Sequence, residues 1–483
     1  MTSADFAALL PFLILTAATV VILLTAAFVR RHKLIAGMTM AALALALASL
    51  PIAAAESPRA VTALVEVDGF SLFFAGLLMA AAFAVAGLSY GYLERRCIRR
   101  EEFYLLLLTA TLGGCILPAS THFASLFLSL ELLTVSLYGL IAYLRTEPLG
   151  IEAAVKYLIL AAASSAFLLF GAALVYAERG TLELGWILLP AASTAGGLHP
   201  VLMPAGLAMV LVGIGFKLAV VPFHMWIPDI YQGAPAPVAG FIATVSKGAV
   251  FAALFRIFSL YAFPSAGGVY PALIAIAVLS MFAGNWLALL QTDVKRMLAY
   301  SSIAHFGYLL VALLAAGGNS VTAAAIYLAA YFAAILTAFG VIGSAADSGE
   351  ADSLGDFRGL FWRRPWAAAF FTAALLSLIG IPLTAGFIGK AYVLLAGVGS
   401  AVWLLAVALI VTSAIGLYYY LRVILMMTRP PDTEAGPGTR AVSGSRLEQL
   451  VLAVLSVLII GLGVYPAPLL ELIQKTAAGV LPF

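Results

Sequence analysis

Four ionisable residues lie inside long apolar segments of the 483-residue chain: Glu131, Lys217, Lys247 and Lys390. A charged side chain at the centre of a bilayer costs about 2.5–3.5 kcal/mol on insertion scales, and such residues usually mark a route for protons or ions. Burial favours the neutral form of a lysine, whereas a nearby carboxylate favours its charged form, so a small movement of the carboxylate can switch such a pair. We therefore expect these four side chains to transfer protons.

Opposite charges on Glu131 and Lys217 predict an ion pair between the segments that carry them. Lys247 has no acidic residue in its own segment, which suits a relay between Lys217 and Lys390. The alternative interpretation is structural: the charges only lock the helices together in an assembly subunit and move no protons.

Three further residues are candidates for an accessory proton path: His305, His224 and Lys156. Ser301, His305 and Tyr308 share one helix face by their spacing of four and three residues, which gives a polar stripe that can hold water. A single histidine is more often a packing residue, and this alternative stands for both histidines. For Lys156 the alternatives are a role beside Glu131 and a contact at the membrane interface.

The composition indicates an integral membrane protein. Apolar residues make up 64% of the chain and charged residues 10%, with a mean hydropathy of +1.10. In soluble domains about 45–50% of the residues are apolar and about 25% are charged. A net charge of +3 without a basic block gives no indication of nucleic-acid binding. Two cysteines and five isolated histidines predict neither a disulfide framework nor a metal or haem site.

Segments of about 20 apolar residues can span a bilayer as helices. Fourteen such segments are predicted, and the expected fold is an all-α polytopic membrane protein. They lie near residues 6–29, 34–55, 69–92, 103–120, 122–144, 153–177, 201–227, 236–261, 270–290, 297–316, 320–345, 365–396, 400–427 and 448–470.

The loop charges predict the orientation, because cytoplasmic loops hold most Lys and Arg. With the N-terminus outside, sixteen loop Lys and Arg residues fall inside and three outside. We therefore expect a multi-pass protein of a bacterial inner membrane with both termini periplasmic, and a retained first span. Arg256 and Arg422 lie nearer the ends of spans, where we expect them to snorkel to the interface.

An internal repeat relates spans 4–8 to spans 9–13. Residues 153–158 (AAVKYL) resemble residues 323–328 (AAAIYL). Because each unit has five spans, the two copies must enter the membrane from opposite sides, as in the inverted repeats of secondary transporters. We expect three N-terminal spans in 1–100, the two units in 101–262 and 263–427, and a cytoplasmic loop with a last span in 428–483.

Glycine and proline break signals occur in spans 7 and 12, over residues 213–222 and 380–390. An open backbone at membrane depth is tolerated where it is buried or lines a wet cavity. Lys217 and Lys390 each lie within a few residues of a break, and their separation of 173 residues matches the repeat offset. Two broken helices with equivalent lysines are therefore predicted.

The segment PFHMWIPDIYQGAPAPV over residues 222–238, the run KRMLAYSSIAH over 295–305 and the four intramembrane charges carry a family resemblance. Across essentially the whole chain the sequence resembles the antiporter-like membrane subunits of proton-pumping NADH:quinone oxidoreductase, respiratory complex I. The DIYQGAP form at residues 229–235 is closest to the chain N type; Mrp-type cation/proton antiporters usually carry a different version.

The resemblance implies that Glu131 and Lys217 form the ion pair of a proton pump, that Lys247 is its central relay and that Lys390 is its exit-side lysine. The chain has no GxGxxG fingerprint and no cysteine set for a cluster. Cofactors are thus expected only in partner subunits of the membrane and peripheral arms: NADH, FMN, iron–sulfur clusters and quinone. Membrane lipid is the other expected partner. The alternative function is an Mrp-like cation/proton antiporter subunit.

Overall fold

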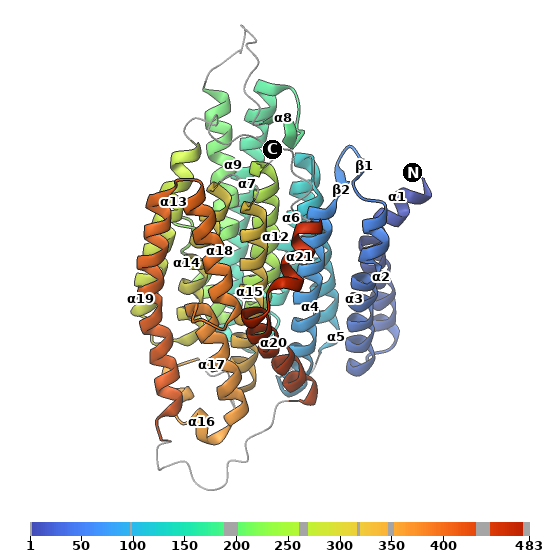
Figure 1. The fold of residues 1–483 in the computed structure, drawn as a ribbon. Helices are drawn as coiled ribbons and strands as arrows, with labels where there is room; N and C mark the ends of the chain where they lie inside the picture. Colours follow the sequence, from blue (N-terminus) through green and yellow to red (C-terminus); the bar gives the residue numbers. More distant parts are fainter. Residues whose placement is uncertain are drawn as a thin grey trace.

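The computed structural model describes residues 2–96, 99–187, 201–259, 269–315, 319–345, 352–430 and 445–476, and its long helices lie side by side along one axis (Figure 1). The first helices are α1 Ser3–Ala8, α2 Leu10–Phe28, α3 His32–Ala55, α4 Gly69–Arg96, α5 Glu101–Ile116, α6 Phe123–Ile141, α7 Pro148–Arg179, α8 Leu184–Ile187, α9 Leu202–Leu218, α10 Ile227–Gly233 and α11 Ala236–Phe241. The others are α12 Lys247–Ser259, α13 Val269–Leu289, α14 Val294–Leu314, α15 Ser320–Ala345, α16 Leu360–Arg363, α17 Pro365–Ile379, α18 Ala385–Gly399, α19 Trp403–Thr428, α20 Arg446–Val464 and α21 Ala467–Thr476. Shorter elements are the 3₁₀-helices η1 Leu117–Ala119 and η4 Leu354–Phe357, the π-helix η2 Ile242–Ser246, and the strands β1 Arg59–Thr62 and β2 Val65–Val67.

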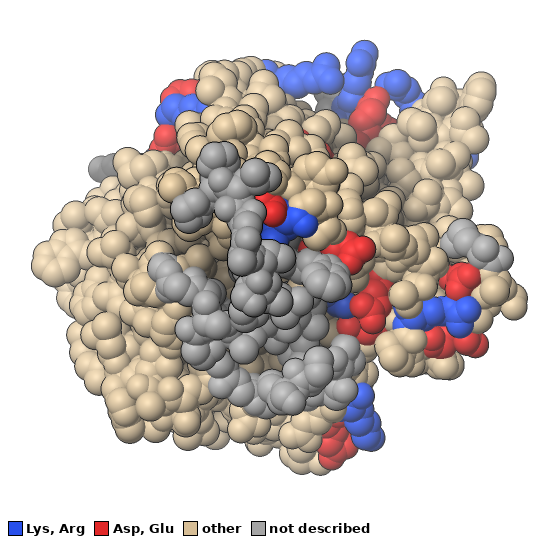
Figure 2. Space-filling view, turned by 90° about the horizontal axis from the view of Figure 1, so that it is seen from above, with Lys and Arg blue, Asp and Glu red and all other residues tan. Residues whose placement is uncertain are grey.

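The prediction of a polytopic all-α membrane protein is confirmed. Within the described residues, 12 helical segments are long and apolar enough to cross a membrane. The two remaining predicted spans are interrupted: in span 7 the helix α9 ends at Leu218 and α10 begins only at the end of the span, and span 12 is divided into α17 and α18. Seen from above, along the helix axes, the charged side chains gather in a few places on this end of the bundle (Figure 2).

Corresponding helices of the two five-span units make corresponding contacts. In the first unit α5 packs on α6 and α7 packs on α9; in the second α13 packs on α14 and α15 packs on α17. The units also meet each other, because α10 contacts α14 and α11 contacts α15. The two units therefore form one continuous bundle, in which α11, η2 and α12 of the first unit pack against the second unit.

The first break follows Leu218, where Ala219 adopts a left-handed conformation with φ of +56° and ends α9. Backbone groups that the break frees find side-chain partners. The Val221 amide donates to the Ser280 hydroxyl at 2.9 Å, and the Trp226 indole donates to the carbonyl of Phe216 at 2.9 Å. These bonds satisfy the open backbone within the protein, as membrane depth requires.

The second break follows Ile379, where Gly380 has φ of +87°. The amide of Gly386 in the first turn of α18 donates to the Ser377 hydroxyl of α17 at 3.0 Å. The two half-helices approach so closely that a Cβ on Gly386 would lie 1.8 Å from the Ser377 carbonyl oxygen. A glycine is therefore required at this position for steric reasons.

Three features departed from the expectations drawn from the sequence. A two-stranded antiparallel hairpin, β1–β2, precedes α4. Span 8 contains the π-helix η2 directly before Lys247. The chain after the last span forms the amphipathic helix α21, whose Thr476 carbonyl oxygen would lie 1.9 Å from a Cβ on Gly69 at the start of α4.

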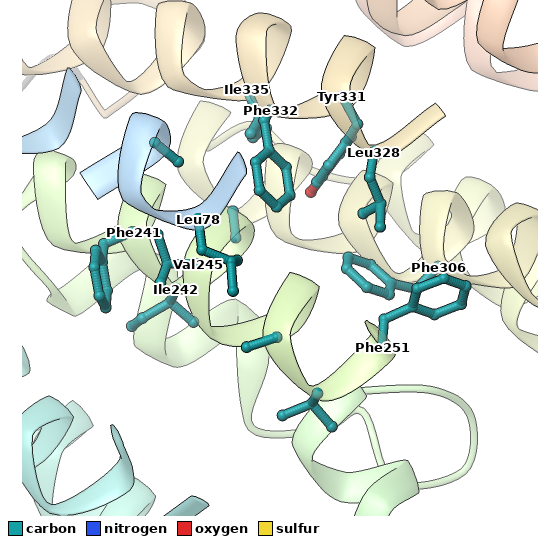
Figure 3. Packing of buried hydrophobic residues seen from close by; sticks show 14 of the residues in the cluster. Leu78, Phe241, Ile242, Val245, Phe251, Phe306, Leu328, Tyr331, Phe332 and Ile335 are labelled. Carbon is teal, nitrogen blue, oxygen red and sulfur yellow. The ribbon is translucent and has the colours of Figure 1, made fainter. Parts of the chain in front are cut away.

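The centre of the bundle is a continuous apolar core that surrounds η2 and α12 (Figure 3). The labelled side chains come from α4, α11, η2, α12, α14 and α15: Leu78, Phe241, Ile242, Val245, Phe251, Phe306, Leu328, Tyr331, Phe332 and Ile335. Among them the Tyr331 hydroxyl is the one polar side-chain group (Figure 3). A polar atom in such surroundings needs a hydrogen-bond partner from the protein.

The snorkelling prediction for Arg256 is wrong. Its side chain is only 6% exposed, and its guanidinium binds both carboxylate oxygens of Asp68 at 3.1 and 2.8 Å and the carbonyl of Pro118 at 2.8 Å. The sequence hid this pair because 188 residues separate its members. Arg422 binds the carbonyl oxygens of Leu289, the last residue of α13, and of Gln291 in the following loop; its snorkelling to the interface stays a prediction.

Gly386→Ala should destabilise the fold by about 1–3 kcal/mol, the usual cost of overpacking. The reason is the clash with the Ser377 carbonyl oxygen. Thermal unfolding of the detergent-purified protein measures this loss of stability. Gly399→Ala in the same helix is the control, because no atom lies within 4 Å of its Cβ. Equal unfolding midpoints for the two variants would contradict the prediction.

Arg256→Gln should destabilise the fold more strongly, by about 3–5 kcal/mol, because it leaves the buried Asp68 carboxylate without its cation. The yield of folded protein and its unfolding midpoint report the effect. Arg31→Gln, at an exposed arginine, should leave both unchanged. A midpoint for Arg256→Gln within error of this control would show that the pair contributes nothing.

Candidate functional site

Glu131 and Lys217 lie in neighbouring helices but do not form the direct ion pair that the sequence predicted. The Lys217 ammonium donates to the Thr134 hydroxyl at 2.8 Å, and Glu131 accepts a hydrogen bond from the Ser165 hydroxyl at 2.5 Å. Thr134 lies three residues after Glu131 and therefore on the same face of α6. The Thr134 hydroxyl, one turn after Glu131, thus occupies the position beside Lys217 that was expected for the Glu131 carboxylate. Lys217 and Glu131 are therefore each held by a neutral partner.

Lys217 is 5% exposed and lies in the last turn of α9. The carbonyl end of a helix carries partial negative charge, which stabilises a cation. A small cavity of about 10 Å³ adjoins the lysine and is lined mainly by apolar side chains such as Leu168 and Ile214. Val250 of α12 also lines it, one turn beyond Lys247. The cavity thus reaches from the first unit to the helix that carries the central lysine.

Lys247 is fully buried at the junction of η2 and α12. Its ammonium donates to the Ser302 hydroxyl at 2.9 Å and lies 4.2 Å from the centre of the Phe306 ring. Both partners belong to α14 of the second unit. A hydroxyl and an aromatic face stabilise a cation more weakly than a carboxylate does. The site therefore binds the Lys247 side chain without requiring that its amino group stays charged.

Ser302 connects Lys247 to two tyrosines: its oxygen lies 2.9 Å from the Tyr331 hydroxyl and 3.4 Å from the Tyr231 hydroxyl. A serine hydroxyl offers two acceptor positions and one proton, whereas an ammonium group can only donate. Lys247 takes one acceptor position, so the tyrosines share the second position and the serine proton. The direction of these two bonds can reverse while the oxygen atoms stay in place, which is a property suited to proton transfer.

His305 is 4% exposed and lies between two tyrosines. Its Nδ1 is 2.6 Å from the Tyr327 hydroxyl and its Nε2 is 3.3 Å from the Tyr420 hydroxyl, which also contacts Ser301. Ser301 and His305 thus share a face, as their spacing predicted. The Tyr308 hydroxyl belongs to a different contact, with the side-chain amide of Asn285.

Lys390 lies at the second break, where its ammonium donates to the carbonyl of Ile379 at 2.8 Å and approaches the Tyr308 ring centre at 5.2 Å. It shares a small cavity with His305, Tyr327 and Tyr331. Through Tyr331 and Ser302 this cavity is connected to Lys247. The second unit therefore offers hydrogen-bonded polar groups from the central lysine to Tyr331, and Tyr331 shares its cavity with His305 and Lys390 at the second break.

The two break lysines are less equivalent than their separation of 173 residues suggested. Lys217 precedes its break, whereas Lys390 follows its break, in α18. The long Lys390 side chain nevertheless returns its ammonium to the carbonyl of Ile379, the last residue of α17. Lys217 thus lies in the last turn of α9 and the Lys390 ammonium lies at the last carbonyl of α17, and the partial negative charge of a helix end stabilises a cation.

Of the accessory candidates, His224 lies in the segment between α9 and α10 and is 9% exposed, and its Nδ1 has no hydrogen-bond partner among the described residues. Lys156 is 46% exposed and pairs with Glu152 and Asp229 at 2.8 Å each. Asp229 in turn binds Arg296 of α14 at 2.7 Å. The exposure and the partners of Lys156 favour the interface alternative over a contact with Glu131.

The sequence interpretation overlooked the hydroxyl groups that bind these charges: Thr134, Ser165, Ser302, Tyr231, Tyr327, Tyr331 and Tyr420. One signal was available, since Thr134 follows Glu131 by three residues. The tyrosines carried none, because apolar helices use them in packing as well. Among the described residues no cluster of three or more His, Cys, Asp or Glu side chains forms a potential metal site.

Comparisons with known proteins agree with this geometry. Residues 120–416 match the family described as NADH:quinone oxidoreductase/Mrp antiporter, transmembrane. The chain is 46% identical to the NADH-quinone oxidoreductase subunit N of Ectopseudomonas mendocina (strain ymp) over 99% of this chain and 97% of that protein.

Solved structures give the same result. A chain of respiratory complex I from Thermus thermophilus is 36% identical, with a TM-score of 0.78 over 95% of this chain and 98% of that chain. A chain of the Mrp complex from Dietzia sp. DQ12-45-1b has a TM-score of 0.85 over 100% and 98% of the two chains, at 22% identity, and therefore shows similarity of fold alone.

Ser302→Ala should destabilise the fold by about 1–3 kcal/mol, because it leaves the buried Lys247 ammonium and Tyr331 hydroxyl without their shared partner. Ser302→Thr keeps the hydroxyl and should retain most of the stability. Ser456→Ala is the control, since the Ser456 hydroxyl is buried without a described partner. Thermal unfolding in detergent measures the three variants. The same midpoint for Ser302→Ala and Ser456→Ala would contradict this view of Ser302.

Proposed function

The chain belongs to the family of NADH:quinone oxidoreductase and Mrp antiporter membrane subunits, and we propose that it carries protons across the membrane as a subunit of a proton-pumping NADH:quinone oxidoreductase. Electron transfer in other subunits drives this transport. The similarity to a subunit N over nearly the full length of both chains supports this choice within the family.

One observation carries the proposal: Lys247 connects through Ser302 and Tyr331 to the cavity of His305 and Lys390 inside an otherwise apolar core. Every link in this set has a group that can both accept and donate a proton. The apolar core around it excludes other ions and prevents leakage, because transfer of a charge into such surroundings is costly.

Each of the four intramembrane charges has a proposed role. Glu131 and Lys217 load the pump, with Thr134 and Ser165 holding the two groups apart in the state described here. A direct contact between the pair would favour the charged lysine and would have to be broken to release its proton. Lys247 relays the proton between the units, and Lys390 is the exit-side group, with His305 beside it. His224 and Lys156 are accessory candidates on the side of the first unit.

The proposed location is a bacterial inner membrane with both termini periplasmic. The basic residues of α16 lie at the lower end of the bundle, opposite to α1 and the hairpin β1–β2 (Figure 1). Arg95 and Arg96 end α4 at that same lower end. The lower end is therefore the proposed cytoplasmic side, because basic residues accumulate there.

Cofactors belong to partner subunits in this proposal. NADH, FMN, iron–sulfur clusters and quinone would be bound in the rest of the membrane and peripheral arms, and this chain would contribute the proton path. The second candidate function is that of an Mrp-like cation/proton antiporter subunit, which the TM-score of 0.85 to an Mrp complex chain keeps open at the level of the fold.

Lys217→Ala and Glu131→Ala should each lower the number of protons pumped per electron, because each removes one group of the loading pair. The measurement uses assembled complexes in inverted membrane vesicles, with NADH oxidation and acidification recorded together. Lys33→Ala, at an exposed lysine, is the control and should pump normally. The same proton yield in all three variants, at normal assembly, would overturn the proposed role.

Copurification separates the two candidate functions. The proposal requires that the chain purifies in mild detergent with quinone-reducing subunits. Sodium-dependent proton exchange by a chain purified without redox partners would favour the antiporter. A purely structural subunit would instead lose assembly in Lys217→Ala and retain the normal proton yield per assembled complex.

A further inference from the structure

A long groove runs between α17 and α20 on the outer surface of the bundle, apart from the charged residues of the proton path. Its volume is about 950 Å³. The walls are apolar along most of their length, with Trp366 and Phe370 on α17 and Leu450, Val457 and Ile460 on α20. Unlike the small cavities beside Lys217 and Lys390, this groove is wide enough for a large apolar ligand.

Basic residues gather at one end of the groove. Arg363, Arg364 and Arg446 all line it, and they lie at the start of α17 and α20. The single acidic residue in the lining is Glu448, whose two carboxylate oxygens each bind Arg95 at 2.9 Å. Because Arg95 neutralises Glu448, this end of the groove keeps an excess of positive charge.

Two of the three arginines have charge available for a ligand. Arg446 is exposed and forms no hydrogen bond or ion pair with the described residues. Among the described residues Arg363 donates to the backbone carbonyls of Asp356 and Arg358, which do not neutralise its charge. Arg364 donates to the carbonyl of Ser344, which holds its guanidinium at the mouth of the groove. The cluster is thus complementary to an anion.

We propose that the groove binds an anionic phospholipid, with its phosphate at Arg363 and Arg446 and its acyl chains along α17 and α20. Guanidinium groups match the oxygens of a phosphate, and basic pockets between membrane helices on the cytoplasmic side bind anionic head groups. Trp366, which is 76% exposed beside the arginines, has the amphipathic character favoured at the level of lipid head groups.

The length of the groove fits a lipid of one leaflet. From Leu450 to Ile460 the α20 wall is about 15 Å long at 1.5 Å per residue. The hydrocarbon core of a bilayer is about 30 Å thick, so one leaflet contributes about 15 Å. An acyl chain whose phosphate is held by the arginines would therefore reach the far end of the groove. A transmembrane helix from a partner would not need arginines at one end.

The bound lipid would support the second break. It packs against α17, and the last carbonyl of α17, that of Ile379, accepts the hydrogen bond from Lys390. A lipid that fills the groove holds α17 against α20 and so steadies the position of this carbonyl. Lipid binding itself does not depend on the proposed function, because the groove and its charges exist in the chain alone.

Binding can be tested with the double variant Arg363→Gln/Arg446→Gln. The protein is purified from membranes with the subunits that accompany it, delipidated, and titrated with phosphatidylglycerol or phosphatidylcholine in detergent. Native mass spectrometry counts the bound lipids. The unaltered protein should prefer phosphatidylglycerol, and the double variant should bind it about tenfold more weakly, since charge-assisted hydrogen bonds are lost. Arg145→Gln, at an exposed arginine in another loop, is the control and should bind normally.

A second variant tests the apolar part of the groove. Ala453→Phe fills the groove without a change of charge, and it should reduce phosphatidylglycerol binding while the arginines remain. Equal phosphatidylglycerol binding by the double variant and the Arg145→Gln control would overturn the proposal, as would equal binding of the two lipids by the unaltered protein. A photocrosslinking residue at Val457 should capture lipid in membranes. Capture of a protein subunit at this position would show a different occupant and would also overturn the proposal.

Discussion

A lysine ammonium inside a bilayer must find oxygen atoms or aromatic faces within the protein, and this requirement shapes the centre of the bundle. Lys247 has one hydroxyl and one ring, Lys217 has one hydroxyl, and Lys390 has one backbone carbonyl and one ring. None of these partners carries a full negative charge. Each ammonium group therefore has a neutral partner in place of a buried ion pair, as the proton-transfer role proposed for these lysines requires.

The broken helices serve this same requirement. A continuous helix uses its carbonyl oxygens internally, but a helix that ends in the membrane exposes its last carbonyls and their partial negative charge. The ends of α9 and α17 supply this environment for Lys217 and Lys390. The cost of opening the backbone is offset by side-chain partners such as Ser280 and Trp226. Helix breaks and buried lysines thus stabilise each other.

Sequence reasoning predicted what periodicity and composition determine. Long apolar segments and the two breaks follow from hydropathy and from Gly and Pro, and the repeat follows from the similarity of residues 153–158 and 323–328; the resulting prediction of a polytopic all-α membrane protein was confirmed. Contacts between distant residues could not be predicted in this way. Arg256 looked like an interface residue until Asp68 was found beside it, and Ser302 looked like one more small residue in a helix. A polar packing residue differs from the hydrogen-bond partner of a buried charge only in its position in three dimensions. A single sequence does not record that position.

The π-helix over Ile242–Ser246 changes how the central span has to be compared with its relatives. Each residue of an α-helix turns the chain by about 100°, and a π-turn accommodates one more residue than an α-turn. The residues after η2 therefore point in directions that differ from those a regular α-helix, continued from the residues before η2, would give them. A helical wheel drawn through the whole span would misplace Lys247 by about one residue, roughly 100°, and assign it to another neighbour within the fully buried surroundings of this span. The orientation of the central lysine is thus encoded in the helical register, by one residue, as much as in the identity of the lysine itself.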